Sequence, residues 1–272
     1  MSVGERSRDR NELIVSYLLL RRIVGWIATL LPIVLLVGNG LFSGAPRPDS
    51  ISGYYYTDMR NVFVGALCAL GVFLVAYRGY DVADDVITDV AGLATIGVAF
   101  CPTKPAVCTG GTGVCPASSV ARLSASQEVV GDIHLLLAAS ALIALGLMAL
   151  RFAKRGDTPP DLGLIDRLRY GLGFGAPAEG WQRRYAGETG IYRVSGLTVL
   201  GCVAAAALSN LLPASVKAHW PWLFIFESGA IFAFGVSWFV KGRAIQAIWD
   251  RVRPGRQART SAPAPRELQG QR

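Results

Sequence analysis

Six long apolar segments alternate with polar and charged segments along the 272 residues of this chain. A helix needs about 20 mainly apolar residues to cross the hydrocarbon core of a membrane. Because backbone polar groups in lipid must be paired within the protein, each span is expected to be an α-helix. The pattern predicts six spans, at about residues 23–42, 61–77, 86–101, 133–152, 194–212 and 221–240.

This pattern predicts an all-α fold, an integral membrane bundle of six transmembrane helices. The strands of a β-barrel would alternate apolar and polar residues over about ten positions, and no segment does so. We expect an N-terminal tail at residues 1–22, a transmembrane domain at 23–242 and a C-terminal tail at 243–272. The C-terminal tail is rich in Pro, Arg and Gln, which predicts disorder from about residue 254.

The distribution of basic residues predicts the orientation of the chain. If the N-terminus is cytoplasmic, 22 of the 27 Lys and Arg residues fall in cytoplasmic segments. Cytoplasmic segments of membrane proteins carry such an excess, so both termini are predicted to be cytoplasmic, with the protein in the plasma membrane. The first apolar run is longer than the roughly 7–15 residues of a signal-peptide core, which predicts an uncleaved first span.

The net charge of +8 is explained by this topology. Basic residues flank the predicted spans, where they can contact anionic lipid headgroups. The lipid bilayer is therefore the expected partner, and nucleic acid is not. The oligomeric state stays open.

Polar and ionisable residues gather near the predicted outer ends of the spans. Such groups are costly inside a membrane and often mark functional sites. Glu227 is the clearest example, because it lies six residues inside the sixth span. If the cluster serves structure alone, Arg60 is expected to pair with Asp58 or Glu227, and His134 to make a hydrogen bond. The candidate ligand-binding set consists of Tyr55, Asp58, Arg60, Asn61, His134 and Glu227.

Three functions are compatible with this set. The first is binding of a lipid or small amphiphile in an outward-facing polar cavity, without catalysis and without a cofactor. The second is a metal-dependent membrane lipid hydrolase, in which zinc held by His134, His219 and Glu227 would activate water. The third is a small proton-coupled transporter with Glu227 or Asp89 as the proton carrier. No HExxH motif and no nucleophile elbow occurs in the sequence, which favours the first function.

Asp89 also has a structural interpretation. It lies near the start of the predicted third span, where the helix dipole favours a carboxylate. We expect it to pair with Arg78, which precedes the span.

Three of the five cysteines, Cys101, Cys108 and Cys115, lie at or within the predicted loop between the third and fourth spans. An oxidising compartment on this side of the membrane would favour a disulfide in this loop. Cys108 and Cys115 flank a turn-forming segment, but which two of the three pair is not decided by the sequence. Cys68 and Cys202 lie within spans and are expected to serve packing.

Three patches of sequence resemble known families: SISGYYYTDMRNVFVG at residues 50–65, YRGYD at 77–81 and ESGAIFAFGVSWFVKG at 227–242. They resemble a group of small uncharacterised bacterial integral membrane proteins. The architecture over residues 23–242 is similar to that of the six-span DUF998 and Frag1/DRAM-type families. These families imply the fold and bring no catalytic residues. Ser52, Asp58 and His134 can also be matched to alkaline ceramidase-like hydrolases, but those have a paired His motif where this chain has Glu227.

Overall fold

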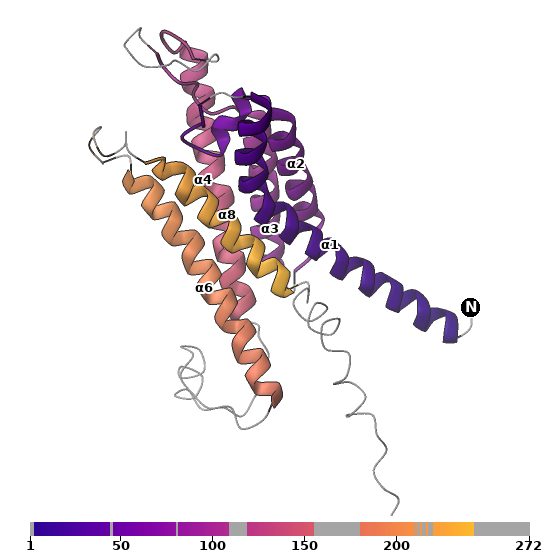
Figure 1. Cartoon of the computed structure of the whole chain (residues 1–272). Helices are drawn as coiled ribbons and strands as arrows, with labels where there is room; N and C mark the ends of the chain where they lie inside the picture. The colour runs from indigo at the N-terminus through magenta and orange to yellow at the C-terminus, as the bar shows by residue number, and fades with distance from the viewer. Residues whose placement is uncertain are drawn as a thin grey trace, which may run out of the picture.

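The computed structural model describes residues 3–43, 46–79, 81–108, 119–154, 180–209, 211, 213, 216 and 220–241. The predicted all-α class is confirmed over this part of the chain, in which an isolated bridge between Val107 and Val120 is the only β-type pairing. Two short helical turns occur, the π-helix η1 (Asn39–Ser43) and the 3₁₀-helix η2 (Ser52–Tyr56). The long helices are α1 (Val3–Gly38), α2 (Arg60–Ala76), α3 (Val82–Phe100), α4 (Ala125–Lys154), α6 (Gly180–Ser209) and α8 (Trp222–Lys241) (Figure 1).

Four of these helices contain a segment long and apolar enough to cross a membrane: Leu19–Phe42, Ala125–Ala153, Thr189–Ser209 and Trp222–Lys241. This composition is that of a multi-pass membrane protein. Helix α2 is apolar but shorter, at 17 residues. Helix α3 has 19 residues, and its first half carries the acidic residues Asp84, Asp85 and Asp89.

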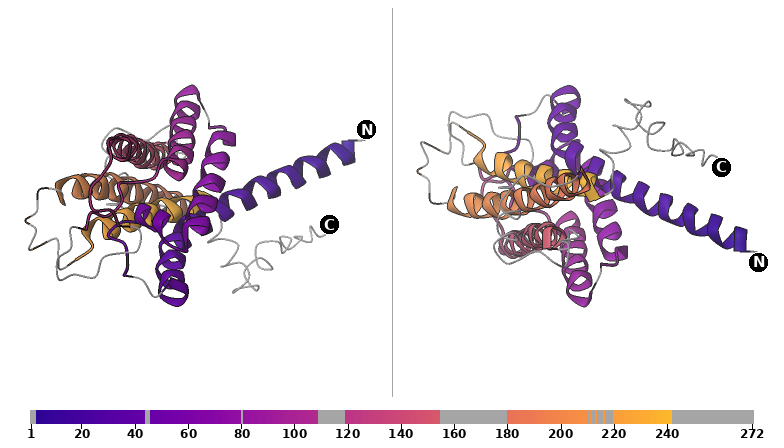
Figure 2. Two further views of the ribbon diagram at one scale, coloured as in Figure 1. Left: turned by 90° about the horizontal axis from the view of Figure 1, so that it is seen from above. Right: turned by 90° about the horizontal axis from the view of Figure 1, so that it is seen from below.

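Several helices extend beyond the predicted spans. Helix α1 takes in nearly all of residues 1–22, which the sequence placed in a tail, and its first part extends away from the bundle (Figures 1 and 2). Helix α3 begins at Val82, before the predicted third span, because the Asp81 carboxylate accepts the Asp84 N–H at 2.9 Å and caps the helix. The tail predicted to be disordered from about residue 254 lies outside the described residues.

The six long helices pack as a ring. Going round it, each helix contacts the next in the order α1, α2, α3, α4, α6 and α8, and α8 packs against α1. The end of the bundle that carries η2 is called the η2 end below. The opposite end, where Arg151 of α4 meets Asp81 before α3, is called the Arg151 end.

Glycines bring neighbouring helices into backbone contact. A methyl group at Gly92 of α3 would lie 2.6 Å from the Gly71 carbonyl oxygen of α2, and one at Gly71 would lie 2.8 Å from the Gly92 carbonyl oxygen. Within a membrane the hydrophobic effect does not drive helices together, and small residues at such contacts let the helices pack closely. The same relation holds for α1 with α8 through Gly25 and Gly235. Between α4 and α6, a methyl group at Gly196 would lie 2.9 Å from the Gly146 carbonyl oxygen.

Two apolar clusters fill the inside of the ring. At the Arg151 end, the fully buried Trp238 packs edge-on against Phe73, Tyr77 and Phe152, at ring-centroid distances of 5.2, 5.2 and 5.9 Å. At the η2 end, the second cluster joins Leu31, Leu35, Ile51, Tyr54, Met59, Phe63, Leu67, Val98, Ala99 and Phe224.

The outer faces of the ring are apolar as well. Water-soluble monomers rarely expose large contiguous apolar patches, whereas lipid acyl chains accommodate them. Exposed large apolar side chains occur on each of the long helices, for example Ile33, Val72, Leu93, Leu136, Leu197 and Phe232.

Candidate functional site

An apolar cavity of about 80 Å³ lies between α2, α3, α4 and α8. The one polar side chain in its described wall is Thr95, whose hydroxyl donates to the Ala91 carbonyl at 2.7 Å within α3. Apolar cavities stay dry and accept apolar groups, and an engineered cavity of about 150 Å³ binds benzene. The wall consists of Leu67, Leu70, Leu74, Thr95, Val98, Ala138, Ala141, Leu142, Leu145, Ile231 and Phe234.

Residues 46–59, called the plug below, fold over the start of α8 at the η2 end. The Phe224 N–H donates to the Asp49 carbonyl at 2.8 Å, which satisfies a donor of the first helical turn that has no partner within the helix. In return, the Ile51 N–H donates to the Glu227 carboxylate at 2.6 Å, and the Ser52 N–H donates to the same carboxylate. Glu227 therefore binds backbone donors that the plug would otherwise leave unpaired.

The plug also has an apolar side that faces the bundle. Ile51, Tyr54 and Met59 are 3 %, 0 % and 6 % exposed. They share one buried cluster with Leu67 and Val98, and these two residues also line the cavity. The plug is therefore continuous with the packing around the cavity at the η2 end.

The predicted ligand-binding residues take part in separate contacts. Arg60 is exposed, lies 4.1 Å above the Tyr55 ring and donates to the Tyr55 hydroxyl. In the described part of the chain neither Asp58 nor Glu227 forms a salt bridge with Arg60, so the pairing suggested by the sequence is not observed. Asp58 and Asn61 are exposed near the start of α2.

His134 is buried at the η2 end of α4. Its Nδ1 lies 2.6 Å from the Cys101 carbonyl oxygen, which confirms the hydrogen bond expected for this residue. His219, the second predicted zinc ligand, lies outside the described residues. Among the residues that the structure does describe, no three His, Cys, Asp or Glu side chains form a group that could hold a metal ion. The contacts of His134 and Glu227 thus add nothing in favour of the metal hypothesis.

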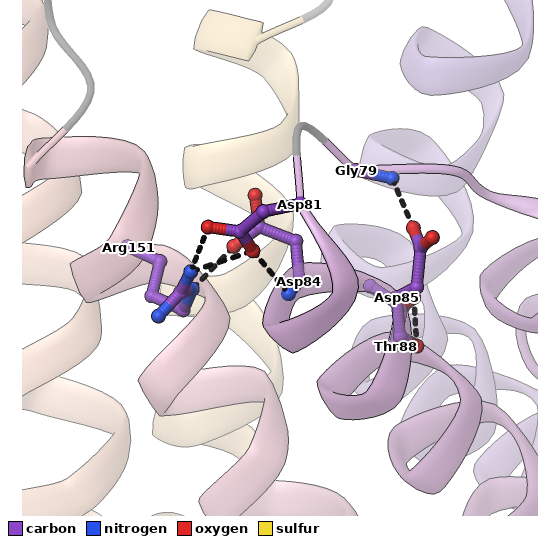
Figure 3. A network of polar contacts seen from close by, with 6 residues as sticks. All are labelled: Gly79, Asp81, Asp84, Asp85, Thr88 and Arg151. Carbon is purple, nitrogen blue, oxygen red and sulfur yellow. Dashed lines mark hydrogen bonds and ion pairs between the residues drawn. The ribbon is translucent and has the colours of Figure 1, made fainter.

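Arg151 of α4 joins two carboxylates at the start of α3 (Figure 3). Its Nη2 lies 2.8 and 2.9 Å from the two carboxylate oxygens of Asp81, and its Nε donates to the Asp84 carboxylate. Asp84 is only 7 % exposed, so this ion pair is partly desolvated. The three residues, called the clamp below, tie α3 to α4 at the Arg151 end.

The sequence did not predict the clamp. It did predict the nearby pair of Arg78 and Asp89, which is confirmed at 3.4 Å with both side chains exposed. The available signal for the clamp was a single basic residue at the end of the fourth span and an Asp-rich start of the third. Such a signal does not say which carboxylates face the arginine across two helices.

Two cations close the aromatic cluster at the Arg151 end. Lys241 Nζ lies 4.6 Å from the centroid of the Phe152 ring and 5.9 Å from that of Tyr192. The Arg21 guanidinium lies 5.3 Å from the centroid of the Tyr77 ring and donates to the Tyr77 hydroxyl at 3.3 Å. Cations are attracted to aromatic faces in this way, so α1 and α8 are tied to the core at this end.

The cysteines divide between free thiols and a disulfide. Cys68, Cys101 and Cys202 are free, whereas Cys108 is disulfide-bonded. Cys115 lies outside the described residues. The Cys108 segment pairs with the strand-like residues before α4 through the Val120 carbonyl at 2.9 Å, on the same side of the bundle as the plug.

No protein-family model, no curated protein and no solved structure matches this chain. The resemblance to the six-span families therefore stays a prediction from the three sequence patches.

Proposed function

We propose that this chain is a six-span protein of the plasma membrane that binds a lipid or small amphiphile without catalysing a reaction. The apolar chain of the ligand lies in the cavity between α2, α3, α4 and α8. The observation that carries the proposal is the cavity itself, a space between four helices that is lined by leucine, alanine and other apolar side chains. Its chemistry matches hydrocarbon and no polar substrate.

The proposed span count includes α2 and α3, although each falls short of one criterion for a span. Both are members of the ring and pack against neighbours that meet the criteria. The Asp residues of α3 lie in its first half, near the Arg151 end, where Arg151 pairs with Asp84 and with Asp81 just before the helix. The positive-inside pattern of the sequence favours the cytoplasm for the Arg151 end and the outside for the η2 end.

The proposed site differs in one respect from the one predicted from sequence. The cavity is apolar, and its described wall contains none of the predicted ligand-binding residues. We place the headgroup of the ligand at the η2 end, where Arg60 is exposed above Tyr55. The guanidinium suits a phosphate or carboxylate oxygen.

Filling the cavity should abolish ligand binding. Ala141 is buried in the cavity wall, and Ala141→Leu would place three additional carbons there. In the wild type, a straight-chain amphiphile at about 100 times its dissociation constant should stabilise the protein by about 2.7 kcal/mol. For a chain of this size that stabilisation corresponds to a rise in Tm of about 5–10 °C. The Ala141→Leu variant should show no rise.

Thermal unfolding in a mild detergent, with amphiphiles of graded chain length, measures this effect. Ala69→Leu on the exposed face of α2 is the matched control and should respond like the wild type. Equal stabilisation of all three proteins would place the ligand elsewhere than in the cavity.

A further inference from the structure

The plug is attached to the bundle by few polar contacts. On α8, it is held by the Glu227 carboxylate and by the Phe224 N–H. Beyond α3, the Tyr56 hydroxyl donates to the Thr103 carbonyl at 2.6 Å. The plug contains a single short 3₁₀ turn, and that turn has no side-chain cap. Its position therefore depends on one buried apolar side and on a small set of hydrogen bonds.

The observed position of the plug against the bundle is called the closed arrangement below. In it, two polar groups lack the hydrogen bonds or hydration that water would provide. The Tyr54 hydroxyl is buried and has no hydrogen-bond partner in the described part of the chain. Burial raises the pKa of the Tyr54 phenol, against a smaller lowering by Arg47, so this group stays a neutral donor. Glu227 is a carboxylate within an apolar span, where charge is costly. An arrangement with the plug lifted would hydrate both groups, and this gain opposes the loss of apolar burial.

The cavity in the closed arrangement is small for a lipid chain. Its volume of about 80 Å³ is roughly half that of the engineered cavity that binds benzene. A longer chain needs a wider cavity. The plug residues Ile51 and Tyr54 pack in the same cluster as the wall residues Leu67 and Val98, so movement of the plug would loosen the wall at the η2 end.

We propose that residues 46–59 are a gate at the η2 end of the cavity, that Glu227 is its latch, and that the apolar chain of an amphiphile enters from this end when the gate lifts. The identity of the entering molecule rests on the function proposed above. The gate itself can be tested without any ligand.

A buried thiol under the gate reports its opening. In a background with Cys68, Cys101 and Cys202 replaced by Ala, Val98→Cys places a probe in the cavity wall below the plug. A charged methanethiosulfonate should label it slowly in the otherwise unchanged protein. Glu227→Ala removes the acceptor of two backbone N–H groups, so labelling should become at least about tenfold faster. Glu227→Gln, which keeps one acceptor oxygen, should give an intermediate rate.

Two controls separate gating from general loosening. Met148→Cys places a probe in the buried cluster at the Arg151 end, and its labelling rate should not change in Glu227→Ala. Ser228→Ala alters the neighbouring residue, whose buried hydroxyl makes no hydrogen bond among the described residues, and should leave the Val98→Cys rate unchanged. Unchanged labelling of Val98→Cys in Glu227→Ala, or equal acceleration at both probes, would overturn the gate.

The gate proposal and the ligand proposal can be contradicted independently. Faster labelling of Val98→Cys in Glu227→Ala, without any stabilisation by amphiphiles, would support the gate and contradict the ligand proposed for the cavity. Stabilisation by amphiphiles that is lost in Ala141→Leu, together with a labelling rate of Val98→Cys that is unchanged in Glu227→Ala, would support the ligand proposal and overturn the gate.

Discussion

Replacing Gly92 by Ala is expected to destabilise the protein by about 2 kcal/mol, within the range found for overpacked interiors. The added methyl group would lie 2.6 Å from the Gly71 carbonyl oxygen and 2.9 Å from the Val75 backbone nitrogen. These are backbone atoms of α2, which cannot rotate away as a side chain can. Helices α2 and α3 would have to separate, and both line the cavity. Thermal unfolding in mild detergent measures the loss.

Gly65→Ala is the matched control for this substitution. It lies on α2, and a methyl group there would meet nothing within 4 Å. Because Ala is the better helix former by up to about 1 kcal/mol, this variant should be as stable as the wild type or slightly more so. Equal destabilisation by the two substitutions would mean that α2 and α3 are not in backbone contact at Gly92.

Replacing Arg151 by Gln is expected to cost about 2 kcal/mol. Removing one partner of a buried ion pair typically costs about 3–5 kcal/mol, because the other charge is left in a poorly solvated place. We expect a cost below this range because the pair is only partly buried: the Asp84 side chain is 9 % exposed, but that of Arg151 is 28 % exposed. The variant should unfold at a lower temperature, and the shift should be smaller in the double variant Arg151→Gln, Asp84→Asn, in which the carboxylate that remains, Asp81, has a side chain that is 43 % exposed.

Arg78→Gln shows what an exposed pair with another carboxylate of α3 contributes. The Arg78 and Asp89 side chains are 64 % and 40 % exposed at 3.4 Å, and exposed pairs contribute about 0–1 kcal/mol. The loss should be small and should vanish in high salt. A loss as large as that for Arg151→Gln would contradict the distinction drawn between the two pairs.

The helical class and the approximate position of the helices could be predicted from hydrophobic pattern alone. The prediction was close for α2 and α8, whose limits fall within a residue or two of the predicted spans. It was incomplete for α1, because the first 22 residues carry many charges and only their local helical preference, not their apolarity, places them in the helix. Glycine contacts such as Gly25 with Gly235 could not be predicted, since they join residues about 200 positions apart.

The candidate site was harder to predict than the fold. The sequence analysis selected polar residues as the candidate site. The cavity is instead lined by Leu, Ala and other residues that a sequence does not distinguish from ordinary core residues. The sequence also did not indicate that Tyr54, the first of three adjacent tyrosines, is fully buried in the plug. The partner of Glu227 is a pair of backbone N–H groups 176 and 175 residues away. A sequence pattern indicates the chemistry of side chains, but it does not indicate which backbone N–H groups will lie beside them.

The central claim, that the cavity holds the apolar chain of a lipid or amphiphile, is tested most directly by native mass spectrometry. The protein is purified in mild detergent, offered a total membrane lipid extract and released from the micelle in the instrument. We predict one non-covalent adduct per chain with the mass of a lipid or amphiphile, present in the wild type and in Ala69→Leu and absent from Ala141→Leu. The bare mass of the chain in all three proteins would contradict the claim.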